Sequence, residues 1–283
     1  IARDVGSMGT VAVRGTGSTW INSGDLHVGQ SGRGSVSVTD SGEVQVSGMT
    51  QLYANGTINI DGGTMSVAQT LQLDAGSTVN LDSGTLSVTS FSGDGSLVWN
   101  GGTLEITAPT GLTVGASGPL GALLAIDADQ TLNVTNTTTI QSGARITALG
   151  GFASDRLTIE SGGQFDAPAG YANQDEIQLS GADARISGSV LKNDGLLRGT
   201  GRIASALVNQ AGGEVRVAAG QQMHLTYSGA QSNAGRINVI GNAMQIAEIE
   251  FDGALTNDAS GFISGQGTSV IYFDGDLDNS GNV

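Results

Sequence analysis

The chain has 283 residues and no cysteine, which excludes disulfides, zinc thiolate sites, iron–sulfur clusters and cysteine nucleophiles together. Its net charge of −15, from 11 basic and 26 acidic residues, argues against nucleic-acid binding and against anionic membrane surfaces, because both need a basic face. Its 46 glycines show no collagen triplet period, and no apolar run reaches the roughly 18 residues that a membrane-spanning helix needs.

Residues 1–107 repeat one short phrase, in which a glycine is followed by two apolar residues with a polar residue between them. Asp61–Val67 and Asp82–Val88 are two of the copies. Alternation of this kind places the apolar pair on one face of a strand, and glycine with Asp, Asn or Ser marks a tight turn. The turn glycines of this region recur at a constant interval, at Gly42, Gly63 and Gly84.

A period of about 20 residues that holds several short strands predicts one coil of a β-solenoid, with neighbouring coils joined by parallel ladders. The expected fold is therefore all-β: a right-handed parallel β-helix of about 14 coils of roughly 20 residues. Val, Ile, Leu and Met should fill the tube, and glycine should serve the corners because it accepts a positive φ. We expect residues 1–283 to form a single solenoid that is part of a longer chain.

Residues 5–48 resemble a repeat found in autotransporter and PEP-CTERM-associated surface proteins. The matching phrases are Val5-Gly6, "GTGSTW" at Gly15–Trp20, "NSGDLHVGQSGRG" at Asn22–Gly34 and "SVSV" at Ser35–Val38. Near the C-terminus, "GALTNDASGFISGQG" resembles the filler repeats of large bacterial adhesins. The resemblance implies a secreted, right-handed parallel β-helix on a bacterial surface. It implies no catalytic activity and transfers no functional residues.

Residues 108–192 are expected to form less regular coils, and a bulge from the tube is expected within residues 108–140. Asp127 and Asp129 alternate, so they are expected to share one strand face. They have no acidic partner nearby for the paired carboxylates of a glycosidase, and a structural or solvated role is favoured. The turn glycines continue here at slightly shorter intervals, at Gly143, Gly163 and Gly181.

Residues 193–283 change the phrase to Asn, a short gap and Gly, and should form wider coils. Four asparagines here recur at nearly constant intervals, which are longer than those of the turn glycines. Asparagine tolerates the left-handed region, and its amide can hydrogen-bond to the equivalent amide in the next coil. The spacing therefore predicts an asparagine ladder of Asn209, Asn233, Asn257 and Asn279.

A calcium loop is a weak candidate at the end of this region. Asp274, Asp276 and Asp278 alternate as in the first half of such a loop. The glycine expected at the sixth position is Asn279, and no glutamate follows at the twelfth. No other metal or cofactor is predicted.

The remaining chemically versatile side chains are interpreted as structural. His27 and His224 are far apart in sequence and each is alone, which favours surface imidazoles. Trp20 and Trp99 adjoin turn phrases, where packing at a coil corner is favoured over stacking on a sugar. The single lysine, Lys192, and the pair Arg198 and Arg202, which is interpreted as rim charges, do not suggest a lyase base.

Three functions remain open. The favoured one is a non-catalytic structural protein of the bacterial surface, in which solenoids join head to tail through their ends as a filament, stalk or matrix. The first alternative is an autotransporter-like adhesin that binds glycans or cells. The second is a polysaccharide lyase or hydrolase, which would need carboxylates gathered in one groove over three consecutive coils.

Overall fold

The computed structural model describes residues 1–283, which form thirty β-strands and no helix. The strands of successive coils pair in parallel, so the predicted all-β parallel solenoid is confirmed, with about 13 turns instead of about 14. No segment forms a helix of the length and hydropathy needed to cross a membrane. The chain divides into two compact units whose boundary lies within residues 113–153, inside residues 108–192, which were predicted to form less regular coils.

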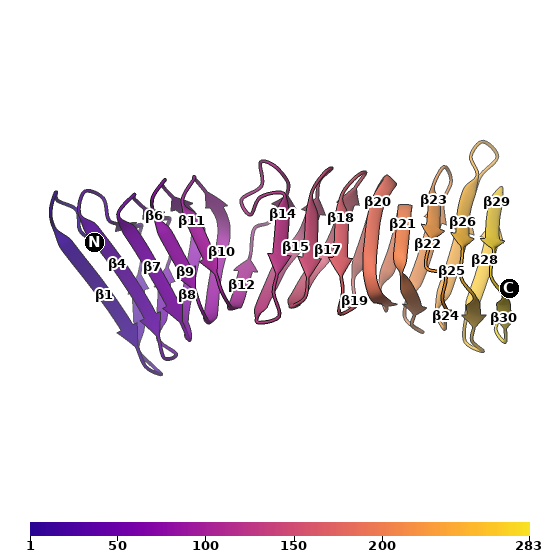
Figure 1. Ribbon diagram of the computed structural model, residues 1–283, viewed down its shortest axis with the longest axis horizontal. Coiled ribbons are helices and arrows are strands. Elements are labelled where there is room, and N and C mark those ends of the chain that lie inside the picture. The colour runs from indigo at the N-terminus through magenta and orange to yellow at the C-terminus, as the bar shows by residue number, and fades with distance from the viewer. The chain divides into compact units, whose positions relative to one another are not determined.

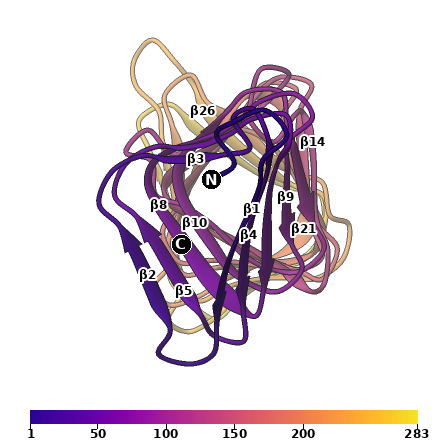
Figure 2. The ribbon, with the colours of Figure 1, turned by 90° about the vertical axis from the view of Figure 1, so that its left-hand side faces the viewer.

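Unit 1 contains residues 1–112, 126–136 and 150–153. Each of its coils has three sides, which β1, β2 and β3 show for the first coil (Figure 2). One side stacks five strands, β1 (Met8–Arg14), β4 (Arg33–Thr39), β7 (Gly56–Asp61), β9 (Thr78–Leu81) and β11 (Ser96–Trp99). The second side stacks β2 (Thr19–Asn22), β5 (Glu43–Val46), β8 (Gly63–Leu73), β10 (Gly84–Ser92), β12 (Gly102–Ile106) and the first half of β15 (Gln130–Ile140). The third side begins with β3 (Leu26–Val28) and β6 (Thr50–Leu52) and continues on the second halves of β8 and β10.

Unit 2 contains residues 113–125, 137–149 and 154–283 (Figure 1). Its first column is β14 (Leu123–Ile126), β16 (Arg145–Ala148), β18 (Gln164–Ala167), parts of β20 (Glu176–Asn193) and β21 (Leu196–Asn209), β23 (Gln222–Leu225), β26 (Ala247–Phe251) and β29 (Ser269–Phe273). The second is β17 (Gly151–Glu160), parts of β20 and β21, β22 (Glu214–Ala218), β25 (Arg236–Ile240) and β28 (Phe262–Gln266). The third is β19 (Tyr171–Asn173), the ends of β20 and β21, β24 (Gln231–Asn233), β27 (Leu255–Asn257) and β30 (Leu277–Asn279). The remaining strand is β13 (Leu112–Val114).

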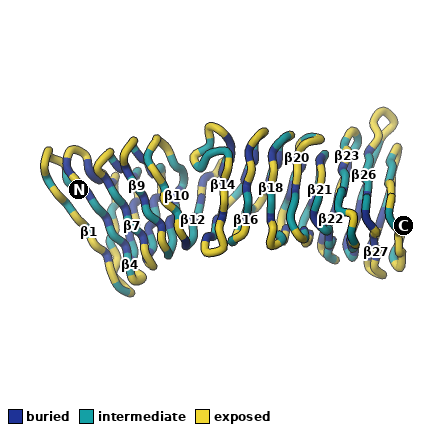
Figure 3. Tube along the Cα trace, in the orientation of Figure 1, coloured by how far each residue is buried: buried dark blue, intermediate teal, exposed yellow.

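The core of each unit is made of columns of apolar side chains in register. In unit 1, one column of fully buried residues contains Val44, Met65, Leu86, Leu104 and Leu132. In unit 2, an equivalent column contains Leu157, Ile177, Leu197, Val215, Ile237 and Ile263. Burial of each such side chain contributes about 1.5–3 kcal/mol to the free energy of folding. Along the strands buried residues alternate with partly exposed ones, as the period-two pattern predicts (Figure 3).

The turn glycines of unit 1 stack as their constant spacing indicates, but positive φ explains only part of the column. Gly84 lies opposite Gly63 and has φ +84°. Gly63 does not have a positive φ; a Cβ there would lie 2.7 Å from Val38 Cγ1 in the preceding coil. Gly42 is likewise constrained by the backbone of Val13. Close approach between coils therefore selects glycine at these corners as much as backbone conformation does.

The glycines predicted as one column in unit 2 do not share one register. Arg145 pairs with Gln164, which places Gly143 opposite Gly162 and Ala144 opposite Gly163. Gly181 lies within β20, directly after Ser180, and a Cβ there would meet Ser161 of the preceding coil. Coil length varies from turn to turn, so similar spacing in sequence does not guarantee the same position in the stack.

The irregular middle contains a loop of consecutive turns at residues 115–122. Three backbone hydrogen bonds connect Gly115, Gly118 and Gly121. Asp127 and Asp129 lie in an exposed turn before β15, and not on a shared strand face as expected. The turn is closed by Gln130, whose Oε1 accepts a hydrogen bond from the Asp127 N–H at 2.7 Å.

Candidate functional site

The coil that contains β30 repeats the inward residues of the coil before it. Leu255 in β27 and Leu277 in β30 occupy the same register position, but Leu255 is 1 % exposed and Leu277 is 37 % exposed. At the other register position, Asn257 is buried and Asn279 is exposed. β30 thus carries the same inward positions as β27.

The first coil of unit 1 shows the same asymmetry. Val11 pairs with Val36, and Trp20 pairs with Val44. Both valines of the second coil are fully buried, whereas Val11 and Trp20 are only partly buried. Trp20 therefore occupies a core-facing register position. Trp99, opposite the buried Leu81, is also partly buried, so packing explains both tryptophans.

A column of asparagine amides, all buried except that of Asn279, runs through unit 2. Each Nδ2 donates to Oδ1 of the next asparagine at 2.6–2.7 Å, over the series Asn173, Asn193, Asn209, Asn233, Asn257 and Asn279. Most members use a second N–H to donate to a backbone carbonyl of the following coil, such as Arg236 O for Asn209. The four asparagines identified by spacing are thus in hydrogen-bonded register, and the column also includes Asn173 and Asn193. The sequence did not predict these two members, because the intervals from Asn173 to Asn193 and from Asn193 to Asn209 are shorter than the later ones and unequal.

The glycines of the Asn–Gly phrases make room for this column. A Cβ at Gly213 would overlap Oδ1 of Asn209, and one at Gly261 would overlap Oδ1 of Asn257. At these two corners the amide therefore sits directly on the glycine that follows it in the phrase, whereas Gly235 and Gly281 meet the amides of Asn209 and Asn257 from the preceding coil. This contact explains why the two residue types recur together.

The outward face of unit 2 carries ion pairs between coils. Glu176 accepts hydrogen bonds from Arg156 at 3.0 Å and from Arg198 at 2.6 Å, so Arg198 belongs to a cross-coil ladder. Two opposing effects act on the pKa of Glu214, and burial by itself would raise it. The hydrogen bonds from Arg216 and Asn238 and the charges of Arg216 and Arg236 outweigh that effect, so the pKa of Glu214 lies below its ordinary value.

His224 has partners that its position in the sequence does not reveal. It lies in β23, in register with Arg202 in the preceding coil and Glu250 in the following coil. Its Nε2 is 2.6 Å from Asp252 Oδ1 and 3.6 Å from Glu250 Oε2. One ligand atom from each of the three residues lies within 4.8 Å of the others. His224 is therefore a surface imidazole, as predicted, but the prediction that it stands alone was wrong.

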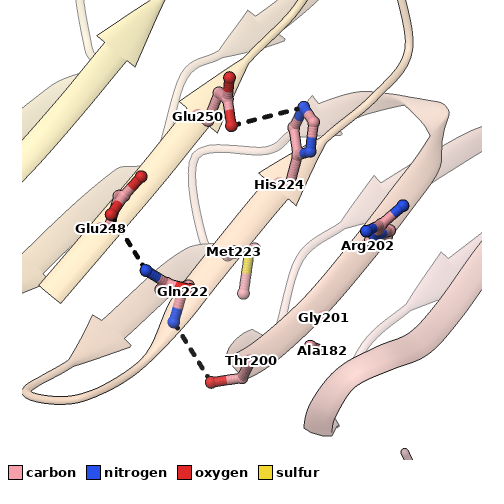
Figure 4. Close-up of a pocket in the computed structure, with 9 residues that line it drawn as sticks. All are labelled: Ala182, Thr200, Gly201, Arg202, Gln222, Met223, His224, Glu248 and Glu250. Atoms are coloured by element: carbon pink, nitrogen blue, oxygen red, sulfur yellow. Dashed lines mark hydrogen bonds and ion pairs between the residues drawn. The ribbon is translucent and has the colours of Figure 1, made fainter.

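A pocket with a volume of about 160 Å³ adjoins this cluster (Figure 4). Gln222 lines it and is held by two hydrogen bonds: its backbone N–H donates to Thr200 Oγ1 at 3.2 Å, and its Nε2 donates to Glu248 Oε2 at 3.2 Å. The other lining residues are Ala182, Gly201, Arg202, Met223, His224 and Glu250. In Figure 4, Arg202 lies on the side of His224 away from Glu250.

The other candidate residues do not form a comparable site. Asp274, Asp276 and Asp278 are all exposed, and no three of the carboxylates in that segment bring ligand atoms within 4.8 Å of one another. His27 is exposed and its Nδ1 lies 3.3 Å from the Tyr53 hydroxyl. Lys192 is exposed in β20 beside the buried Asn193.

No protein-family model matches the chain, and no curated protein matches it. A solved structure that aligns with it is the TibC-catalysed hyper-glycosylated fragment 55–350 of TibA. The alignment covers 93% of this chain and 94% of that chain, at 12% sequence identity and a TM-score of 0.31. Likeness at that level carries no argument about function, so the strand pairing described above is the basis for the fold.

Proposed function

We propose that this chain is a structural β-solenoid of the bacterial cell surface, an element of a filament, stalk or matrix whose end coils stack on further coils. The resemblance of residues 5–48 to the repeat of secreted surface proteins supports an extracellular location. The composition supports a structural role, because the coils are built from stacked apolar columns, glycine corners and an amide ladder.

The observation that carries the proposal is the repeated register of the coils in unit 2. Leu255 pairs with Leu277 and Asn257 pairs with Asn279, so β30 offers a further coil the same inward side chains that β27 offers to β30. The edge of an outermost strand also presents unpaired N–H and C=O groups that template another strand. A further coil, from a longer chain or from a second copy, would cover both. Because opposite ends differ, copies would join head to tail, and such contacts produce open filaments.

Concentration-dependent assembly of the purified chain tests this proposal. We expect the sedimentation coefficient to rise with concentration and micrographs to show copies joined end to end. Leu277→Lys places a charge on the open face and should abolish the assembly. Met244→Lys is the matched control, because Met244 is 94 % exposed but lies in the loop between β25 and β26. A wild-type chain that stays monomeric at every concentration, or equal behaviour of the two variants, would contradict end stacking.

An adhesin that binds glycans is the alternative, and one observation favours it. Tyr272 in β29 is half exposed and lies in register with Glu250, so an aromatic ring adjoins a carboxylate on the outer face. Aromatic rings with neighbouring polar groups are common in sugar sites. A glycan array with wild type and Tyr272→Ala separates the two proposals.

The proposal includes no catalytic role. What supports this is the placement of the best acidic pair, Asp127 and Asp129, in an exposed turn next to a side-chain amide. A glycosidase needs two carboxylates that face each other across a groove. Incubation of the chain with bacterial and plant polysaccharides, followed by assay of reducing ends, would detect an activity that contradicts this part of the proposal.

A further inference from the structure

We propose that His224, Glu250 and Asp252 form a binding site for a divalent transition-metal ion of the Zn²⁺ type on the outer face of unit 2. The three side chains come from two neighbouring coils. His224 is in β23, Glu250 is its register partner in β26, and Asp252 directly follows β26. In an extended chain alternate residues project to the same side, so both carboxylates are directed toward the imidazole.

The distances fit a compact metal site. Nε2 of His224 lies 3.6 Å from Oε2 of Glu250 and 2.6 Å from Oδ1 of Asp252. Donors bound tetrahedrally to Zn²⁺ at about 2.0–2.2 Å are about 3.3–3.5 Å from one another. The Glu250 separation is already close to this range. The Asp252 carboxylate has to move by less than about 1 Å, which a rotation of its side chain provides.

The chemistry of the donor set selects the class of ion. Imidazole nitrogen suits Zn²⁺ and its neighbours in the first transition row, whereas Ca²⁺ and Mg²⁺ prefer sites made entirely of oxygen. Three protein ligands also leave a fourth position of a tetrahedral ion open. The pocket of about 160 Å³ beside His224 and Glu250 provides the space for a water molecule in that position.

The charges around the cluster favour a cation on balance. Glu248 lines the same pocket, and Asp274 lies in the following coil next to Asp252, because Phe251 pairs with Phe273. Arg202 is the one nearby positive side chain, and it lies on the side of His224 away from Glu250. Its charge opposes the metal, but it lies in the coil on the other side of His224 from both carboxylates.

Such an ion would join two coils at a place where the stack is irregular. The coil from β23 to β26 is longer than the coils before and after it, and the extra length includes the exposed loop of residues 241–246. A metal bridge from His224 to Glu250 and Asp252 would fix these coils to one another. Binding of the metal ion should therefore be saturable, and it should also stabilise the folded chain.

Calorimetric titration of the purified chain with ZnCl₂ at about 0.15 M salt tests the proposal, since that salt concentration screens non-specific attraction to an acidic surface. We expect one saturable site and a rise in the thermal unfolding midpoint. His224→Ala and Asp252→Asn should each reduce the affinity at least tenfold. His27→Ala, which removes the other histidine, should leave binding unchanged. Arg202→Gln should retain or strengthen it.

Two further measurements separate this site from a general effect of acidic residues. Co²⁺ in place of Zn²⁺ should give visible absorption bands of a four-coordinate ion with nitrogen and oxygen donors, and His224→Ala should remove them. CaCl₂ should bind far more weakly than ZnCl₂. Absence of saturable Zn²⁺ binding, equal binding of Ca²⁺, or binding that His224→Ala leaves intact would overturn the proposal and leave an ordinary pair between His224 and Asp252.

Discussion

Asn233 donates a hydrogen bond from Nδ2 to Oδ1 of Asn257 over 2.7 Å, and neither side chain has any exposed surface. Asn233 also accepts from Nδ2 of Asn209 at 2.6 Å. Each inner amide of the column thus satisfies one donor and one acceptor on its two neighbours. Polar groups this deep are stable only while every partner is present, because a buried polar atom without a partner loses its hydration without compensation.

Asn233→Ala is expected to destabilise unit 2 by about 2–5 kcal/mol, because it leaves a buried donor on Asn209 and a buried acceptor on Asn257. Asn80→Ala is the control, since Asn80 donates to Asn59 at 2.7 Å on a partly exposed face. Thermal unfolding and backbone hydrogen exchange measure both effects. Equal, small losses for the two variants would show that the buried amides contribute no more than outward ones.

Gly84→Ala and Gly143→Ala separate the two reasons for glycine at coil corners. Both residues have positive φ, +84° and +74°, so both substitutions introduce backbone strain of about 1–2 kcal/mol. A Cβ at Gly143 would meet no atom within 4 Å, whereas one at Gly84 would overlap the carbonyl oxygen of Gly63. We expect a clearly lower thermal midpoint for Gly84→Ala than for Gly143→Ala. Equal midpoints would mean that backbone conformation alone selects glycine.

Stability should fall at high pH because of Tyr171. Burial, with a smaller contribution from the negative charge of Asp175, raises the pKa of Tyr171 from 10.0 to about 12. The raised value means that the folded chain holds the phenolic proton more tightly. The contribution of the protonated Tyr171 to the free energy of unfolding is therefore complete below pH 10 and is lost as the pH rises toward 12. The rise of the pKa from 10.0 to about 12 sets the upper limit of this loss at about 2–3 kcal/mol. Partial exposure of the side chain makes the actual loss smaller.

Tyr171→Phe keeps the edge-to-face contact with Phe165, whose ring centroid is 5.0 Å away, and removes the titrating group. Denaturant unfolding at pH 9 and pH 11.5 compares the two chains. The gap between their stabilities should narrow or reverse at the higher pH. A constant gap would show that Tyr171 does not titrate in this range.

The sequence predicted the parts of the fold that repeat locally. Alternation within each strand identifies inward residues such as Val44 and Met65 without knowledge of the coil length. Regular spacing also brought Asn209, Asn233, Asn257 and Asn279 together. Both signals follow from one physical constraint, because equivalent positions in stacked coils have equivalent surroundings.

Features that depend on the variable length of the coils could not be predicted in this way. The coil from Asn193 to Asn209 is much shorter than the coil from His224 to Glu250. A shift in register moved Gly163 away from Gly143, and the insertion at residues 241–246 concealed the partners of His224. A search for outward His, Asp and Glu over the whole range of coil lengths in this chain would have found the cluster, together with many false matches.

The direction of the amide column bears on the proposed stacking of copies. From Asn173 to Asn279 every link runs the same way, with nitrogen on the earlier residue and oxygen on the later one. The series of hydrogen bonds therefore has a direction along the chain. Two molecules that met tail to tail would set like amide atoms against each other, so under the proposed stacking the amides would disfavour a symmetric dimer and favour head-to-tail contacts.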